Sequence, residues 1–89
     1  MSVPVIKDFY ADWCGPCKMQ TPILEALKKK HGDKVEVEKI DVDAHGALAT
    51  EYAIRVVPTL VIEKDGKIIK RIEGVADLAT LESYLKSFL

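Results

Sequence analysis

The sequence predicts a layered α/β domain in which a mixed sheet carries helices on both faces. Apolar runs of strand length alternate with stretches of helical periodicity, in the order βαβαββα. The first strand, helix and strand have the length of a right-handed parallel crossover unit. The last two strands flank Asp65-Gly66, a pair that supplies the positive-φ residues of a tight antiparallel hairpin. Parallel and antiparallel pairs are therefore expected in one sheet.

The first two strands are expected at residues 3–10 and 35–42. Residues 3–10 are apolar apart from Lys7 and Asp8, as in a central strand that is covered on both faces. Pro4 is tolerable because it lies near the start of the strand. A carboxylate within such a strand is costly to bury, so Asp8 is a candidate functional residue.

A long helix is expected between these strands, from about residue 14 to residue 30. Apolar positions recur there at helical spacing, and Gly32 suits the C-cap. Pro22 lies inside the helix, where it removes one backbone donor and clashes with the preceding turn. A kink near Lys18 is therefore expected.

The second half of the chain predicts a short helix, two strands and a final helix. Residues 44–52 fit a short helix that Gly46 weakens, and residues 59–63 and 67–72 are the hairpin strands. The final helix begins after Asp77, which can cap it. Its apolar stripe consists of Leu78, Leu81, Leu85 and Phe88.

The composition is that of an ordinary globular chain of 89 residues, of which 48% are hydrophobic and 30% charged. This length suits a single domain spanning residues 1–89. With 13 basic and 14 acidic residues the net charge is -1, so neither a nucleic acid nor an anionic membrane is an expected partner. No secretory signal or membrane-spanning run is evident, and a cytoplasmic location is expected.

Both cysteines of the chain lie in Cys14-Gly15-Pro16-Cys17, at the junction of the first strand and the long helix. Unpaired N–H groups and the helix dipole stabilise a thiolate there, so Cys14 is the candidate nucleophile and is expected to be the exposed thiol of the two. Cys17 lies about one turn along, close enough to attack the Cys14 sulfur in a mixed disulfide, and is the candidate resolving thiol. Gly15 leaves access for an incoming disulfide, and Pro16 fixes φ in the first turn.

The alternatives to thiol chemistry for the cysteine pair are a zinc site and two inert core residues. A zinc site would need two further ligands, and neither His31, at a helix end, nor the isolated His45 forms a second paired site. Inert core cysteines would not account for the placement at a helix start. Thiol chemistry is favoured over both, and no metal is expected.

The segments "DFYADWCGPCKMQTPILEALKKK" and "IRVVPTLVIEKDGKIIKRIEG" resemble the thioredoxin family, and the similarity covers essentially the whole chain. The resemblance implies a thioredoxin-like three-layer sandwich with a central four-stranded mixed sheet. It implies reduction of protein disulfides by dithiol exchange, in which Cys14 attacks and Cys17 resolves. No bound cofactor is then expected, because electrons come from an external reductase. The expected partners are thioredoxin reductase or an equivalent and disulfide-containing substrate proteins, and the chain is expected to act as a monomer.

The resemblance also assigns a substrate groove. Pro58 is implied to be a cis-proline that faces the cysteines, although the residues alone favour the trans form of any X-Pro bond. Val57 is implied to lend backbone hydrogen bonds to an extended substrate segment. The family also implies that Trp13 flanks the site, and Gly15 and Pro16 are assigned to substrate binding beside it. Gly74 is assigned there as well because, like Gly66, it matches a turn glycine of the family, although plain turn chemistry accounts for both equally well.

The family places a buried acid six residues before the first cysteine, and Asp8 occupies that position. Burial is expected to raise the pKa of Asp8, so that it can accept the proton that Cys17 loses. Lys39 is its expected partner, because alternation along the second strand places Lys39 on the face that also carries Val35 and Val37. The alternative is that strand pairing has ended by Lys39 and its amine reaches solvent.

The chain departs from the family in two ways. Most thioredoxins carry a strand and a helix before the strand that starts here at Val3, so the chain resembles the short, glutaredoxin-sized thioredoxins of archaea. Tyr10 stands where many relatives have tryptophan. The size leaves open a glutaredoxin-like protein that takes electrons from glutathione, and a docking module without turnover is a further alternative. Cys-Gly-Pro-Cys and Val-Pro-Thr favour the thioredoxin activity.

Overall fold

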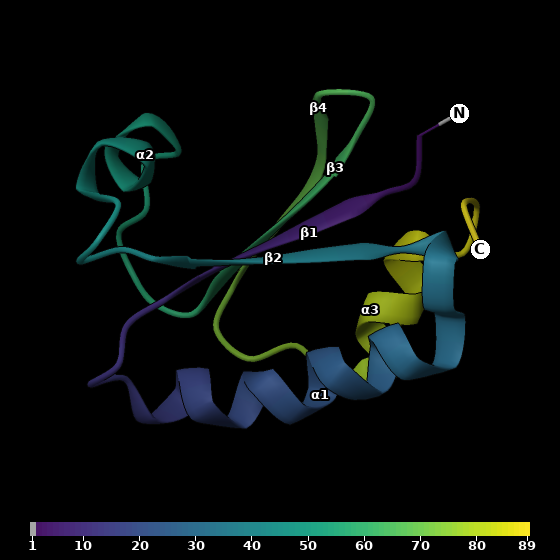
Figure 1. The fold of residues 1–89 in the computed structure, drawn as a ribbon, viewed down its shortest axis with the longest axis horizontal. Helices are drawn as coiled ribbons and strands as arrows, with labels where there is room; N and C mark the ends of the chain where they lie inside the picture. The colour runs from purple at the N-terminus through teal and green to yellow at the C-terminus, as the bar shows by residue number, and fades with distance from the viewer. Residues whose placement is uncertain (1) are drawn as a thin grey trace.

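The chain folds in the predicted order of elements, and the computed structural model describes residues 2–89 (Figure 1). The strands are β1 (Val5–Tyr10), β2 (Glu36–Asp41), β3 (Thr59–Lys64) and β4 (Lys67–Glu73). The helices are α1 (Gly15–His31), α2 (Gly46–Glu51) and α3 (Leu78–Leu85). A short 3-10 turn, η1 (Gly32–Lys34), connects α1 to β2.

The strands form one mixed sheet in the order β2-β1-β3-β4. β1 pairs in parallel with β2 and antiparallel with β3, and β3 pairs antiparallel with β4. The turn between β3 and β4 has positive φ at Asp65 and Gly66, as the sequence predicts. β1, which carries Asp8, is thus a central strand with a neighbour on each side.

Helices cover both faces of this sheet, and the predicted three-layer sandwich is confirmed. α1 and α3 pack against each other on one face, whereas α2 lies on the opposite side of the strands (Figure 1). Side chains alternate along β1, so Ile6 joins the core beneath α1 and α3, and Phe9 joins the core on the α2 side. The larger core contains Ile6, Leu24, Leu27, Val35, Leu60, Ile62, Ala76, Leu81 and Leu85.

α2 is shorter than the predicted 44–52. The N–H groups of Ala44 and His45 donate to the carbonyl of Asp41 at 3.2 and 2.9 Å, so these residues belong to a turn rather than to the helix. The helix cannot continue past Ala53, which has a φ of 53°. The prediction placed the helix correctly and misjudged both ends.

α1 spans Gly15–His31 with Pro22 inside it, as the sequence predicts, whereas α3 is shorter than predicted. α3 ends at Leu85, so Phe88 lies beyond the helix that was predicted to carry it, with the Lys64 ammonium 5.7 Å from its ring. None of the helices within residues 2–89 is long and apolar enough to cross a membrane.

Candidate active site

The two cysteines form a disulfide at the N-terminus of α1, where the chain passes from β1 into the helix. Cys14 is the N-cap residue, with extended backbone angles, and its Cα lies 5.3 Å from that of Cys17. Pro16 occupies the first helical turn, where its missing N–H leaves no partner unsatisfied. The expected difference in exposure is not found, because Cys14 and Cys17 are 4% and 3% exposed in the disulfide.

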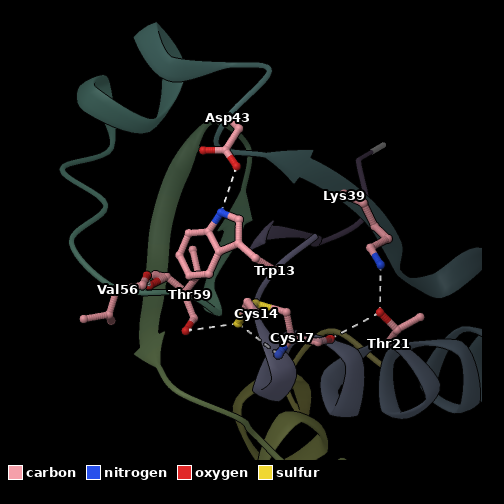
Figure 2. The surroundings of a disulfide bond; sticks show 9 residues. Trp13, Cys14, Cys17, Thr21, Lys39, Asp43, Val56 and Thr59 are labelled. Carbon is pink, nitrogen blue, oxygen red and sulfur yellow. Dashed lines mark hydrogen bonds between the residues drawn. A yellow bond between two sulfur atoms is a disulfide. The ribbon is translucent and has the colours of Figure 1, made fainter. Parts of the chain in front are cut away.

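The environment of the Cys14 sulfur does favour negative charge. The backbone N–H of Cys17 donates to Cys14 Sγ at 3.2 Å, which satisfies one of the free N–H groups at the start of α1 (Figure 2). The carbonyl oxygen of Val57, 3.5 Å from the same sulfur, can accept from a protonated Cys14 thiol but does not stabilise the thiolate. A hydrogen bond to the charged form and the positive end of the helix dipole both stabilise a thiolate at Cys14.

The loop before β3 faces the disulfide. The peptide bond between Val57 and Pro58 is cis, as the family resemblance implies. The N–H of Gly74, whose φ is 96°, donates to the Pro58 carbonyl at 2.8 Å. Gly74 therefore contributes to the site through its backbone N–H, which holds the loop that carries Pro58.

An exposed apolar surface adjoins the cysteines. Trp13 is 71% exposed and Val56 is 47% exposed, both well above the values expected of core residues. Together with Val57 they line a hollow of about 210 Å³. The ring of Trp13 is fixed because its Nε1 donates to a carboxylate oxygen of Asp43 at 2.9 Å (Figure 2). Asp43 was not predicted as a site residue, although its position just after the second strand could have suggested it.

Asp8 is fully buried on the face of β1 that points toward α1. Neither carboxylate oxygen has a hydrogen-bond partner among residues 2–89. Burial raises the pKa of Asp8 from 3.8 to about 6, and the positive charge of Lys39 opposes this shift. The expected raised pKa is present, and its expected cause is correct.

Lys39 is only partly where the sequence places it. Its Cα is the register partner of Asp8 across the parallel β1–β2 pair, as expected. The ammonium, however, does not pair with the carboxylate: it donates to Thr21 Oγ1 at 2.7 Å (Figure 2). It also lies 4.6 Å from the centre of the Tyr10 ring. Strand pairing continues through Lys39 to Asp41, so the alternative in which pairing has ended by Lys39 is wrong, although the residue is exposed as that alternative expects.

Gln20 is a buried polar residue that sequence reasoning missed. Its side-chain amide accepts from the N–H of Ala76 at 2.8 Å and donates to the carbonyl of Ala76 at 2.9 Å. These bonds tie α1, one turn after the second cysteine, to the segment that follows Gly74. No local pattern predicts them, since the partners are 56 residues apart.

No group of three or more histidine, cysteine or acidic side chains within residues 2–89 is placed to hold a metal ion. His31, one of the two histidines weighed as a ligand, instead contacts Glu82 on α3, with Nε2 and Oε2 2.7 Å apart. The cysteine sulfurs are bonded to each other.

Comparisons with known proteins agree with this geometry. The thioredoxin family model matches residues 1–87. A thioredoxin-like protein of Synechocystis is 46% identical over 86 residues, which cover 97% of this chain and 82% of the relative. Thioredoxin 1 of Synechococcus elongatus is 39% identical over 88 residues, which cover 99% of this chain and 82% of the relative.

A solved structure of a mutant thioredoxin from Halobacterium salinarum superimposes with a TM-score of 0.87 at 44% identity, covering 96% of this chain and 74% of that one. The chain therefore belongs to the thioredoxin family, and with its redox-active cysteine pair it is a thiol–disulfide oxidoreductase that reduces protein disulfides.

Proposed function

We propose that Cys14 and Cys17 act in a fixed order. The Cys14 thiolate attacks one sulfur of a substrate disulfide, forms a mixed disulfide and releases the first substrate thiolate. Cys17, once deprotonated, attacks Cys14 Sγ, releases the second substrate thiolate and closes the Cys14–Cys17 disulfide. The hydrogen bond from the Cys17 N–H to Cys14 Sγ supports this order, because it stabilises the thiolate of Cys14 and has no counterpart at Cys17 among the described residues.

Asp8 is the proposed acceptor of the Cys17 proton. It lies on the face of β1 that α1 covers, and Cys17 is in the first turn of that helix. A carboxyl group with a pKa of about 6 is mostly ionised at pH 7 and is a stronger base than an exposed carboxylate. Lys39 acts at a distance, since its charge limits the rise of the Asp8 pKa.

The substrate segment is proposed to lie along the proline loop, beside Trp13. Three features support this location: the exposed Trp13 ring, the adjoining hollow and the approach of the Val57 carbonyl to Cys14 Sγ. Gly15 and Pro16 are exposed at the tip of α1, and no atom lies within 4 Å of the place that a side chain at Gly15 would take. An incoming disulfide therefore meets little obstruction there.

The electron source is proposed to be an external reductase of the thioredoxin reductase type, with no cofactor bound to this chain, and the active form is proposed to be a cytoplasmic monomer. Family membership supports a reductase in general terms. The thiol pair by itself can carry the two electrons, because closing the Cys14–Cys17 disulfide releases them.

The decisive experiment compares two electron sources with one protein-disulfide substrate. We expect rapid turnover with NADPH and thioredoxin reductase, and slow turnover with glutathione and its reductase. The control is Cys14→Ser, which should be inactive in both assays. A clear preference for glutathione would replace the proposal with a glutaredoxin-like activity.

The order of attack has a test of its own. Cys17→Ser should accumulate a covalent complex with the substrate through Cys14, because the resolving thiol is absent. Cys14→Ser should trap no substrate by this route. Mass spectrometry of the mixed disulfide identifies the linked cysteine, and a linkage to Cys17 in the wild-type background would reverse the assignment.

A further inference from the structure

The Lys39 ammonium is held by two side chains to which the thiol chemistry gives no role. Thr21 Oγ1 accepts a hydrogen bond from Lys39 Nζ at 2.7 Å, and the centre of the Tyr10 ring lies 4.6 Å from the same nitrogen. Thr21 comes from α1 and Tyr10 from β1, so the ammonium is held between the helix and the sheet. Figure 2 shows Lys39 reaching from β2 toward the Thr21 hydroxyl.

The Thr21 hydroxyl connects this ammonium to the second cysteine. An ammonium can only donate, so the oxygen of Thr21 must accept from Lys39 and its own proton is free for another partner. That partner is the carbonyl oxygen of Cys17, 3.4 Å away and one helical turn earlier (Figure 2). A chain of donor and acceptor groups thus runs from Lys39 through Thr21 to the Cys17 backbone.

The strand register places Lys39 opposite Asp8, and the charge of Lys39 acts on the Asp8 carboxyl group. Lys39 is the cross-strand partner of Asp8, and Tyr10 follows two residues later on the same face of β1. A hollow of about 130 Å³ is lined by Thr21, Lys39, Tyr10 and Cys17. The charged or titratable groups around Lys39 are Asp8 and Tyr10 from β1, Asp12 from the next loop, Asp41 from its own strand, and, from α1, Cys17, Lys18, Glu25, Lys28 and Lys29.

We infer that Thr21 and Tyr10 are positioning residues that keep the Lys39 ammonium beside Asp8. They thereby set the pH range in which Asp8 takes the Cys17 proton, and this second statement rests on the proposed function of Asp8. An exposed lysine has a flexible stem and a strongly hydrated head, so without these two contacts it would extend into water. One hydroxyl acceptor and one aromatic face restrict it to a single place.

The electrostatic consequence has a definite sign. The charge of Lys39 lowers the pKa of Asp8 against the larger effect of burial. Release of the ammonium into solvent removes that opposing effect, so the pKa of Asp8 must rise further above its ordinary value. If instead Thr21 draws Lys39 away from Asp8, removal of the hydroxyl would let the pKa fall.

The test uses Thr21→Val, which keeps the shape of the side chain and removes the hydroxyl, and Thr21→Ser, which keeps the hydroxyl. The matched control is Thr50→Val, because Thr50 Oγ1 makes the same kind of bond to the carbonyl four residues earlier, at 3.0 Å, without a lysine. The readout is the pKa of the Asp8 carboxyl group in the oxidised protein, where the cysteines do not titrate. The NMR chemical shift of the carboxyl carbon follows this titration. Asp8→Asn assigns the signal.

We expect the pKa of Asp8 to rise in Thr21→Val, to be restored in Thr21→Ser and to be unchanged in Thr50→Val. In a Lys39→Met background, Thr21→Val should have no further effect, because the group that Thr21 positions is absent.

The Tyr10 contact is tested in the same way. Tyr10→Leu should raise the pKa of Asp8 as Thr21→Val does, whereas Tyr10→Phe, which keeps the aromatic face, should not. An unchanged or lowered pKa in Thr21→Val, or an equal shift without Lys39, overturns the inference.

A second readout separates this inference from the proposed role of Asp8. Single-turnover resolution of a preformed mixed disulfide should slow about twofold at pH 6 in Thr21→Val and remain at the parental rate at pH 8. If Asp8→Asn resolves the mixed disulfide at the parental rate, the proton-acceptor role is wrong. The NMR titration of Thr21→Val then still decides whether Thr21 positions Lys39.

Discussion

Asp8 and Lys39 face each other across β1 and β2, yet no hydrogen bond joins the carboxylate to the ammonium in the described chain. The ammonium is bound to Thr21, and both oxygens of Asp8 are left without partners. The two charges therefore interact only through space. This arrangement keeps the pKa of Asp8 near 6, within the range in which a proton acceptor for a thiol is useful.

Asp8→Asn should stabilise the oxidised protein at pH 7. The pKa of Asp8 is raised from 3.8 to about 6 on folding, so the ionised carboxylate opposes folding. This cost is absent below pH 3.8, grows as the pH rises toward 6 and is constant above that value. Allowing for the polar amide that replaces the carboxylate, we expect a gain of about 1–2 kcal/mol at pH 7.

Urea unfolding at pH 4, 5, 6, 7 and 8 measures this effect. Asp33→Asn is the control, because it makes the same charge change at an exposed position in η1. The stability difference between Asp8→Asn and the parent should increase from pH 4 to pH 6 and then level off. A variant that is less stable than the parent at pH 7 would show that Asp8 is held by hydrogen bonds as a structural group.

In the reduced protein, Cys14 should be alkylated faster than Cys17 at pH 7. Exposure does not provide the reason, since the two residues are almost equally buried in the disulfide. The reason is the stability of the thiolate. Cys14 Sγ accepts a hydrogen bond from the Cys17 N–H and lies at the positive end of the α1 dipole, and both stabilise a negative charge on this sulfur. Peptide mapping after a short iodoacetamide pulse gives the two rates, and equal labelling would contradict the assignment of Cys14 as the thiolate.

Gly74→Ala should destabilise the protein, whereas Gly46→Ala should not. Neither position has an atom within 4 Å of the added methyl group, so space is equal in both. Gly74 has a φ of 96°, which costs an alanine about 1–3 kcal/mol. Gly46 begins α2 with no positive φ, and alanine there should be neutral or stabilise by up to about 1 kcal/mol.

The same pair tests the proline loop. The Gly74 N–H holds the carbonyl of Pro58, so strain at Gly74 should shift that loop against Cys14. We expect Gly74→Ala to raise the KM for a protein disulfide about threefold with a smaller change in kcat. The measurement is steady-state reduction at a temperature where both variants are fully folded, and an unchanged KM would show that the loop does not depend on this bond.

The element order and the cysteine chemistry could be predicted because their signals are local. Apolar periodicity gave the strands and helices, Asp65-Gly66 gave the hairpin, and Cys14 to Cys17 lie within one turn. The ends of α2 were missed, since apolar periodicity does not reveal the turn that Asp41 closes with Ala44 and His45, nor the positive φ of Ala53, which is uncommon for a residue other than glycine.

The contacts of Lys39 could not be predicted from the pattern of its own strand. Alternation along β2 placed Lys39 correctly opposite Asp8. The hydrogen-bond acceptor for the Lys39 ammonium, however, is Thr21, which lies on α1. The distance between α1 and β2 depends on the core between them, which a strand pattern does not contain. The cis form of the bond before Pro58 was likewise predicted by family resemblance and not by the residues alone.

Gln20→Ala should strongly destabilise the protein. Gln20 is fully buried, and its amide satisfies both the N–H and the carbonyl of Ala76. Truncation leaves two buried backbone groups unpaired and opens a cavity beside α1, so we expect a loss of about 2–4 kcal/mol. The control is Met19→Ala, the adjacent residue on α1, which is 63% exposed and should change stability by less than about 0.5 kcal/mol.

Urea unfolding of the oxidised proteins at pH 7 measures both changes. Gln20→Glu supplies a second comparison, because it keeps the acceptor for the Ala76 N–H but loses the donor to the Ala76 carbonyl and adds a buried charge. It should be destabilised at pH 7 and recover part of that loss as the pH is lowered and the carboxyl group takes a proton to donate. If Gln20→Ala is as stable as Met19→Ala, the bridge to Ala76 does not hold the segment after Gly74 against α1.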